Sequence, residues 1–227
     1  MTERKVMANL NHPFIIKLKY SFQTQSNLYL ILEYCAGGDL SEYLNIEWSF
    51  AEKKARFYMA EILCAIEELH SRGILFWDLK PDNVVLDAEG HAILTDFGLS
   101  RESLNDEMAE SFCGSYAYLA PEMLKREGHG KSVDWYLLGV FLYEMLFGIP
   151  PYYDNDRDTL FQNILNKDLE FSHDNISEEA RDLLLGLLNK HPLEWLGAKA
   201  GAEEVKSHWW FKSINWDSVM KRELSPP

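Results

Sequence analysis

The sequence predicts an α+β fold, with a small β-rich part at the N-terminus and a larger, mainly helical part after it. Residues 14–22 and 28–34 are rich in β-branched and aromatic residues, and residues 23–27 supply a polar turn between these two runs. From residue 49 onward, most apolar residues recur instead at the three- and four-residue spacing of helices.

The helical pattern covers several long segments. The spacing of apolar residues predicts helices over residues 1–10, 49–70, 133–147, 159–167 and 177–190. Ser49 and Glu52 match a capping box at the start of the second helix, and Gly73 ends that helix. The third helix is apolar on nearly every side, which is typical of a helix buried all round.

The composition favours one intracellular domain. At 227 residues, 47% of them hydrophobic, the chain is long enough for a single core. A net charge of -14 argues against nucleic acid or an anionic membrane as the main partner and favours cationic substrates. No apolar run reaches membrane-spanning length, and the N-terminus has no signal-peptide core. The three cysteines form no CxxC pair, so we expect no disulfide framework and no zinc site.

A polar stretch after an apolar run carries the candidate chemistry. Residues 74–76 are apolar, and Asp78 and Lys80 follow them closely. Pro81 then excludes helix and favours a turn, so the two charged residues lie in a loop between short strands. An acid and a base placed so close together suit the activation of a hydroxyl beside a phosphate.

A hairpin is predicted directly after this loop. Val84–Leu86 and Ala92–Leu94 are short apolar runs, and Gly90 between them can adopt the positive φ of a tight turn. Such a hairpin brings Asn83 and Asp96 together at its open end. A carboxylate and an amide oxygen, completed by phosphate oxygens and water, are a usual way to hold Mg²⁺. The loop and the hairpin together predict phosphoryl-transfer chemistry.

These residues resemble the catalytic loop and the metal-binding motif of eukaryotic protein kinases. The matching stretches, in the order of that family, are Asp78-Leu79-Lys80-Pro81-Asp82-Asn83, Asp96-Phe97-Gly98, Ala120-Pro121-Glu122, and Asp134 with Gly139. His12-Pro13-Phe14 and Phe112-Cys113-Gly114-Ser115 make the chain similar to the AGC group of serine/threonine kinases. The resemblance implies a partial small β lobe over residues 1–34, a hinge and helical large lobe over 35–213, and the start of a C-terminal tail over 214–227.

The resemblance also implies ATP and Mg²⁺ as cofactors and a role for each site residue. Asp78 would orient or deprotonate the acceptor hydroxyl, Lys80 would stabilise the transferred phosphate, and Asn83 with Asp96 would hold the metal. Asp134 would brace the catalytic loop backbone. The implied nucleotide contacts are Glu3, Glu33, Cys35, Asp39, Asp82, Val85 and Thr95. Of these, Glu33 and Cys35 in the hinge would bond the adenine edge through their backbone groups.

Acidic residues on one groove indicate the substrate class. By the same resemblance Asp39, Asp82 and Glu144 face a common groove, which favours protein substrates with basic residues upstream of the acceptor Ser or Thr. The alternative is that they are scattered surface acids, and Asp39 can equally cap a helix through Tyr43. We expect a monomer located in the cytoplasm, with the nucleus as a second possibility.

Two tryptophans depart from the family pattern. Ser111 matches the activating phosphorylation site and implies an upstream kinase, but Trp77 replaces the arginine that clamps such a phosphate, and an indole has one neutral donor. Trp195 replaces the arginine that pairs with Glu122, so a buried carboxylate is expected to lack its partner, at a typical cost of about 3–5 kcal/mol. Tyr116-Ala117 is a milder departure in the substrate-facing loop.

The sequence contains neither a GxGxxG loop nor a Val-Ala-Ile-Lys strand. With Trp77 in addition, we expect weak or no turnover from the chain as it stands. Two alternatives to a protein kinase stay open: a catalytically impaired pseudokinase or scaffold that binds nucleotide or partners, and a small-molecule phosphotransferase. Ala120-Pro121-Glu122 argues against the second, since that motif serves a protein substrate.

Overall fold

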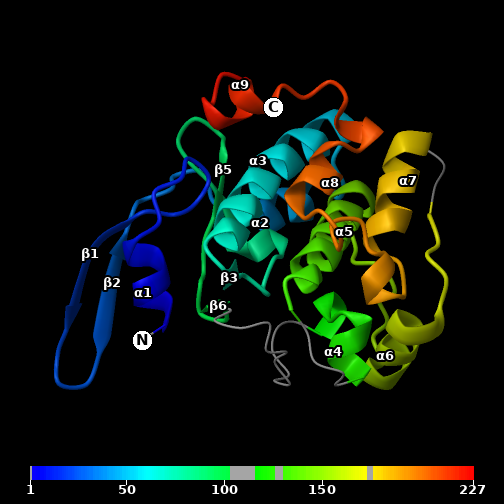
Figure 1. The fold of residues 1–227 in the computed structure, drawn as a ribbon, viewed down its shortest axis with the longest axis horizontal. Helices are drawn as coiled ribbons and strands as arrows, with labels where there is room; N and C mark the ends of the chain where they lie inside the picture. The colour runs from blue at the N-terminus through cyan, green and yellow to red at the C-terminus, as the bar shows by residue number, and fades with distance from the viewer. Residues whose placement is uncertain (1, 103–115, 126–129, 173–175) are drawn as a thin grey trace.

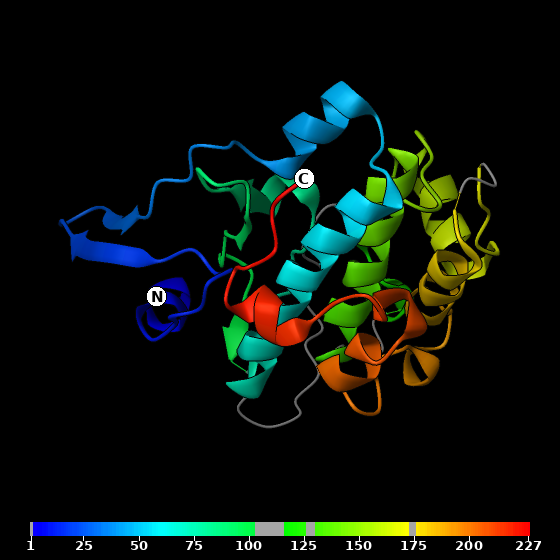
Figure 2. The same cartoon turned by 90° about the horizontal axis from the view of Figure 1, so that it is seen from above.

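A computed structural model of the protein describes residues 2–102, 116–125, 130–172 and 176–227 (Figure 1). The small N-terminal part consists of α1 (Thr2–Ala8) and an antiparallel hairpin of β1 (Leu18–Gln23) and β2 (Leu28–Leu32). Figure 2 shows this hairpin projecting from one side of a larger helical body. The predicted α+β fold is thereby confirmed.

Two helices form the centre of the larger body. These are α3 (Glu52–Ser71) and α5 (Ser132–Phe147), which pack against each other. The other helices are α2 (Leu40–Glu47), α4 (Pro121–Lys125), α6 (Arg157–Asn166), α7 (Glu178–Leu187), α8 (Ala202–Lys206) and α9 (Trp216–Met220). Short 3₁₀ turns are η1 (Pro81–Asn83), η2 (Tyr116–Tyr118), η3 (Pro192–Glu194) and η4 (Trp209–Phe211).

Two short strand pairs lie in the segment between α3 and α4. β3 (Ile74–Leu75) pairs with β6 (Arg101–Glu102), and β4 (Val84–Leu86) pairs with β5 (Ala92–Leu94), both in antiparallel fashion. The second pair is the hairpin that the sequence predicts. It is closed by the Asp87 carbonyl, which accepts the Gly90 amide at 3.2 Å, and Gly90 has a φ of 93°.

The strand predicted over residues 14–22 is too long at its start, because β1 begins only at Leu18. Phe14 and Ile16 are buried and pair with the edge of β5 instead. The Ile16 amide donates to the Leu94 carbonyl at 2.9 Å, and the Leu94 amide donates to the Phe14 carbonyl at 2.8 Å. This short segment therefore attaches the small part to the hairpin that precedes Asp96.

The buried helix α5 confirms the apolar pattern of residues 133–147 and organises the core. Its residues are almost all buried, and α7 packs closely against it. At Gly139 an added Cβ would lie 2.8 Å from the Cβ of Leu187, so the close approach of α7 requires glycine at this position. The predicted helix over 177–190 is α7, with Ser177 as its N-cap and its end three residues early.

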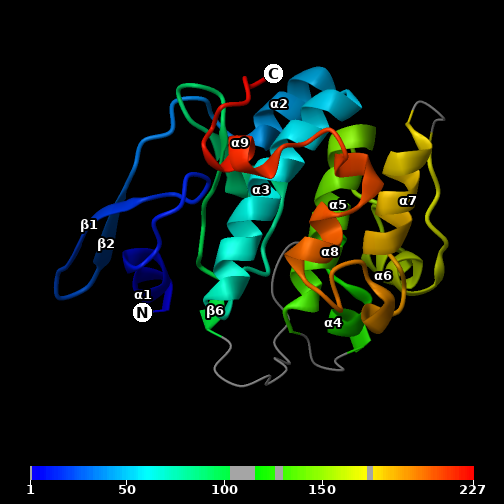
Figure 3. The same ribbon diagram turned by 45° about the horizontal axis from the view of Figure 1, so that its top comes forward.

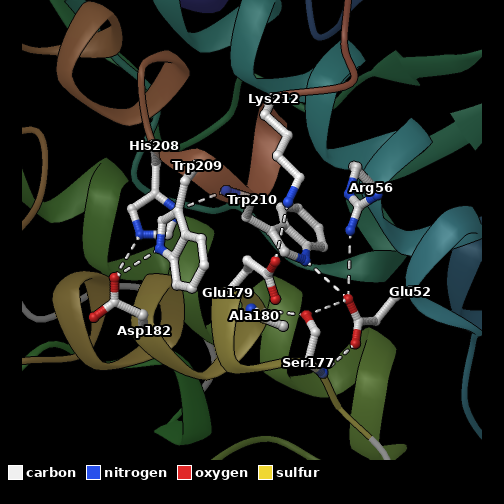
Figure 4. A network of polar contacts seen from close by, with 10 residues as sticks. All are labelled: Glu52, Arg56, Ser177, Glu179, Ala180, Asp182, His208, Trp209, Trp210 and Lys212. Carbon is white, nitrogen blue, oxygen red and sulfur yellow. Dashed lines mark hydrogen bonds and ion pairs between the residues drawn. The ribbon is translucent and has the colours of Figure 1, made fainter.

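The capping box predicted for Ser49 and Glu52 is wrong. The N-cap of α3 is Ala51, which makes no side-chain capping bond. The Glu52 carboxylate instead accepts hydrogen bonds from the amide of Ser177 at 2.5 Å, from its hydroxyl at 2.8 Å and from the Trp210 indole at 3.0 Å (Figure 4). Glu52 therefore joins the start of α3 to α7 and η4.

The C-terminal segment lies along α3, where α8 and α9 both contact that helix (Figure 3). Arg222, just after α9, forms ion pairs with Asp87 and Glu89 in the turn between β4 and β5. The segment is thus tied to the same hairpin from outside. Among the described residues, no helix combines the length and the apolar character needed to cross a bilayer.

Candidate active site

The loop after β3 brings an acid, a base and an amide together. Asp78 is only 8% exposed, and the Asn83 side-chain amide donates to its carboxylate Oδ2 at 2.8 Å and to its backbone carbonyl at 2.7 Å. The Lys80 ammonium lies 3.4 Å from the same Oδ2. Burial raises the pKa of Asp78, while the Asn83 hydrogen bond and Lys80 lower it and the charge of Asp96 raises it. The carboxylate is held in place by donors yet kept basic by burial.

The open end of the β4–β5 hairpin brings Asn83 and Asp96 together, as the sequence predicts. The Thr95 amide donates to the Asn83 carbonyl at 2.9 Å, which extends the ladder by one residue toward Asp96. Asp96 has a φ of 60°, and its Oδ1 accepts the Gly98 amide at 3.1 Å. A non-glycine residue with this backbone is uncommon and is found often at functional sites.

The donor set of this pair fits a magnesium ion. The Asn83 side-chain nitrogen donates a hydrogen bond to Asp78, so the amide oxygen is left for a cation. Asp96 uses Oδ1 to accept the Gly98 amide and can offer its second carboxylate oxygen to the same cation. No group of three or more His, Cys, Asp or Glu side chains suited to a metal occurs among the described residues. A hard cation here would take its other ligands from phosphate oxygens and water, as Mg²⁺ in phosphoryl-transfer sites does.

Asp134 on α5 braces the loop from behind. It is fully buried, and its carboxylate accepts the Phe76 amide at 3.0 Å and the Trp77 amide at 2.7 Å. His70 Nε2 lies 2.7 Å from the same carboxylate. The predicted bracing role of Asp134 is confirmed, whereas the sequence does not predict the contact of His70 with Asp134. No sequence signal marks this histidine, because its partner lies 64 residues away.

Backbone hydrogen bonds join the hinge segment to β4. The Gly37 amide donates to the Leu86 carbonyl and the Leu86 amide donates to the Gly38 carbonyl, both at 2.8 Å. An added Cβ at Gly37 would lie 2.6 Å from the Cβ of Leu86, so only glycine permits this approach. Asp39 follows as the N-cap of α2 and bridges to Val85. The predicted nucleotide contacts Asp39 and Val85 thus lie next to each other.

The other predicted nucleotide contacts have mixed outcomes. Of the two hinge residues predicted to bond adenine through the backbone, Glu33 uses its amide to donate to the Lys17 carbonyl at 2.9 Å. Glu33 can therefore serve an adenine only through its carbonyl, while Cys35 is half-buried beside it. Thr95 stands between the hairpin and Asp96. The side chain of Glu3 and the whole of Ser111 lie outside the described residues.

Glu144 on α5 has a carboxylate oxygen that is available to a ligand. Its Oε2 is buried and has no hydrogen-bond partner among the described residues. Burial, with a further contribution from the negative charge of Asp82, raises the pKa of Glu144 to about 8. Asp82 lies in η1, and α2, capped by Asp39, packs against this turn. The predicted acids Asp82 and Glu144 are therefore electrostatic neighbours.

Trp195 is buried and has a hydrogen-bond partner of its own. It is 1% exposed, its indole donates to the Asn189 carbonyl at 2.5 Å, and its ring lies 5.2 Å from that of Tyr136. Glu122 is buried but is not without a partner. The cost that the sequence predicts for the loss of the arginine partner of Glu122 stays a prediction.

Residues 1–211 match the protein kinase domain family. The chain belongs to this family, which its catalytic loop, hairpin and Asp134 brace already indicate. The predicted resemblance to AGC-group serine/threonine kinases is likewise confirmed.

Three curated relatives share the name serine/threonine-protein kinase Sgk1. The Xenopus tropicalis protein is 47% identical over 229 residues, which cover 100% of this chain and 54% of the relative. The proteins of Homo sapiens and Gallus gallus are each 46% identical over 229 residues, covering 100% of this chain and 53% of the relative. The chain thus spans about half the length of these relatives. The comparisons give no support to a non-catalytic pseudokinase.

Proposed function

We propose that this chain carries the catalytic machinery of an ATP-dependent serine/threonine protein kinase. The observation that supports the proposal most directly is the hydrogen bond from Asn83 to Asp78 at the end of the hairpin that leads into Asp96, with Asp134 holding the loop backbone. Membership of the protein kinase domain family supports the same reaction class. The acceptor is proposed to be a Ser or Thr hydroxyl, in line with the names of the relatives.

The chemical roles follow from the contacts at the loop. Asp78, kept basic by burial, accepts or orients the proton of the acceptor hydroxyl. Lys80 faces the same carboxylate and stabilises the phosphate as it transfers. Asn83 and Asp96 would hold Mg²⁺, which would neutralise charge on the ATP phosphates when bound. The hinge carbonyl of Glu33 and the backbone of Cys35 would bind adenine.

The proposed substrates are proteins with Arg or Lys upstream of the acceptor. Support comes from the open carboxylate of Glu144, from its neighbour Asp82 and from Asp39 at the start of α2. The overall charge of -14 favours the same class of partner. An upstream kinase acting on Ser111, a monomeric state and a cytoplasmic or nuclear location complete the proposal as predictions from the family resemblance.

Transfer of radiolabelled γ-phosphate from ATP to an Arg-rich Ser peptide tests the proposal. We expect Asp78→Asn to lower kcat by about 100-fold or more, since a general base contributes roughly 10²–10⁴-fold, while the Tm stays unchanged. Asp217→Asn, which removes an acid in α9, serves as the control and should retain full activity. A folded wild-type protein that binds ATP but transfers no phosphate would contradict the proposal, and so would Asp78-independent transfer.

A further inference from the structure

Trp77, directly before Asp78, has a strained backbone. Its φ is 63°, in the left-handed region, and its side chain is only 3% exposed. A bulky residue in this region is a genuine outlier, and such a conformation persists only where the surroundings hold it. The direction in which Asp78 leaves the chain depends on this backbone, so whatever holds Trp77 also sets the position of the Asp78 carboxylate.

The start of α5 holds Trp77 at two points. Its amide donates to Asp134 Oδ1 at 2.7 Å, in the first turn of the helix. Its indole Nε1 donates to the carbonyl of Gly130, two residues before that helix, at 3.3 Å. The first bond holds the backbone of Trp77, and the second bond holds its ring. The acceptor of the first bond, Asp134, is fully buried in the core, and the acceptor of the second, Gly130, is half-buried.

We propose that Trp77 is a positioning residue for Asp78, acting through the hydrogen bond from its indole to Gly130. The proposal rests on the proposed kinase function and adds to it a residue that touches neither substrate nor nucleotide. The indole bond keeps residue 77 in its left-handed conformation, and this conformation aims Asp78 at the Asn83 amide and the Lys80 ammonium. Because the bond joins two uncharged groups, salt does not screen it as it screens surface ion pairs.

Trp195 provides a matched control for a purely structural tryptophan. It is as deeply buried as Trp77, and its indole also donates to a backbone carbonyl, that of Asn189. Its backbone, however, is relaxed, with a φ of -62°, and its ring packs beside that of Tyr136. Loss of the indole donor should therefore affect folding at both positions but catalysis only at Trp77.

The experiment compares Trp77→Phe with Trp195→Phe. We expect Trp77→Phe to lower kcat on the order of 10- to 100-fold with unchanged KM values for ATP and peptide, since a small misplacement of a catalytic group costs about this much. Trp195→Phe should lower the Tm and leave kcat per folded molecule unchanged. Equal kcat in wild type and Trp77→Phe would overturn the proposal, and so would equal losses of kcat in the two variants.

Two further measurements keep the result interpretable. If Trp77→Phe does not fold, replacement of Trp77 by 3-benzothienylalanine keeps the bicyclic shape but removes the N–H donor, and the same loss of kcat is expected. Hydrogen exchange of the Phe76 and Trp77 amides tests the proposal without any activity. Faster exchange in the Trp77 variant but not in the Trp195 variant is expected, and unchanged exchange would refute the positioning role even if the wild type proves inactive.

Discussion

Two acidic side chains of the helical body have contrasting surroundings. Glu52 at the start of α3 accepts three hydrogen bonds from Ser177 and Trp210, and Arg56 lies 3.4 Å from the same carboxylate (Figure 4). Glu144 on α5 has a buried oxygen with no partner among the described residues, and burial raises its pKa to about 8.

The contrast distinguishes Glu52, a carboxylate that stabilises the fold, from Glu144, a carboxylate that is available to bind a ligand. A buried carboxylate is stable when donors surround it and costly when they do not. Glu52 has its donors from within the chain, so removing it leaves those donors stranded. Glu144 lacks a donor that a guanidinium or ammonium group could supply, so removing it costs folding little and substrate binding much. Substitutions of Glu52 and Glu144 test this distinction.

The largest expected effect is on stability, from Glu52→Ala. The substitution leaves the Ser177 amide and the Trp210 indole without their acceptor, and each stranded donor costs about 1–3 kcal/mol. We expect the free energy of unfolding to fall by roughly 3 kcal/mol in urea titration. The control is Glu170→Ala, which removes an exposed pair with Lys167 and should change it by less than about 1 kcal/mol. Similar effects of the two substitutions would contradict the structural role of Glu52.

The second effect is on substrate binding, from Glu144→Gln. The variant keeps the shape of the side chain but loses the charge that would pair with a basic residue. A charged hydrogen bond contributes about 1.5–3 kcal/mol, so we expect KM for an Arg-containing peptide to rise by about 10-fold or more, with kcat unchanged. Wild type and variant should have equal KM values for a peptide in which citrulline replaces the arginine. A variant that binds both peptides as wild type does would remove Glu144 from the substrate site.

The same contrast shows what the sequence can predict. Asp78, Asn83 and Asp96 lie within 19 positions along the chain, and a proline turn and a two-strand hairpin, both local structures, bring them together. The buried helix α5 is equally predictable, because its apolar residues cover every face. These features need no knowledge of distant partners.

The predictions from sequence are wrong where residues far away along the chain determine the contacts. The pattern of Ser49 and Glu52 fits a local cap, yet the donors that Glu52 uses lie 125 and 158 residues away. Residues 14–16 have the composition of a strand, but their partner is the edge of β5 rather than β2. Periodicity describes which faces of an element are apolar, and it does not describe which element covers them.

The smallest expected effect is the pH dependence that Glu144 adds to stability. Its pKa is about 8 in the folded protein, against an ordinary value of 4.5, so the folded state binds more protons between these values. Stability should therefore fall as pH rises from about 4.5 to about 8, and Glu144→Gln should remove this part of the dependence. Because burial raises the pKa of Glu61 to about 8 as well, the informative quantity is the difference between wild type and variant.

Urea titrations and peptide-binding measurements at several pH values between 5 and 9 check this prediction. The affinity of wild type for the Arg-containing peptide should increase as pH rises toward about 8, because an ionised carboxylate is the form that pairs with a guanidinium. Stability and affinity should thus change in opposite directions over one pH range, as expected of a carboxylate that only a substrate can satisfy. Parallel curves for wild type and Glu144→Gln would show that Glu144 already has a partner within the fold, and the contrast with Glu52 would then fail.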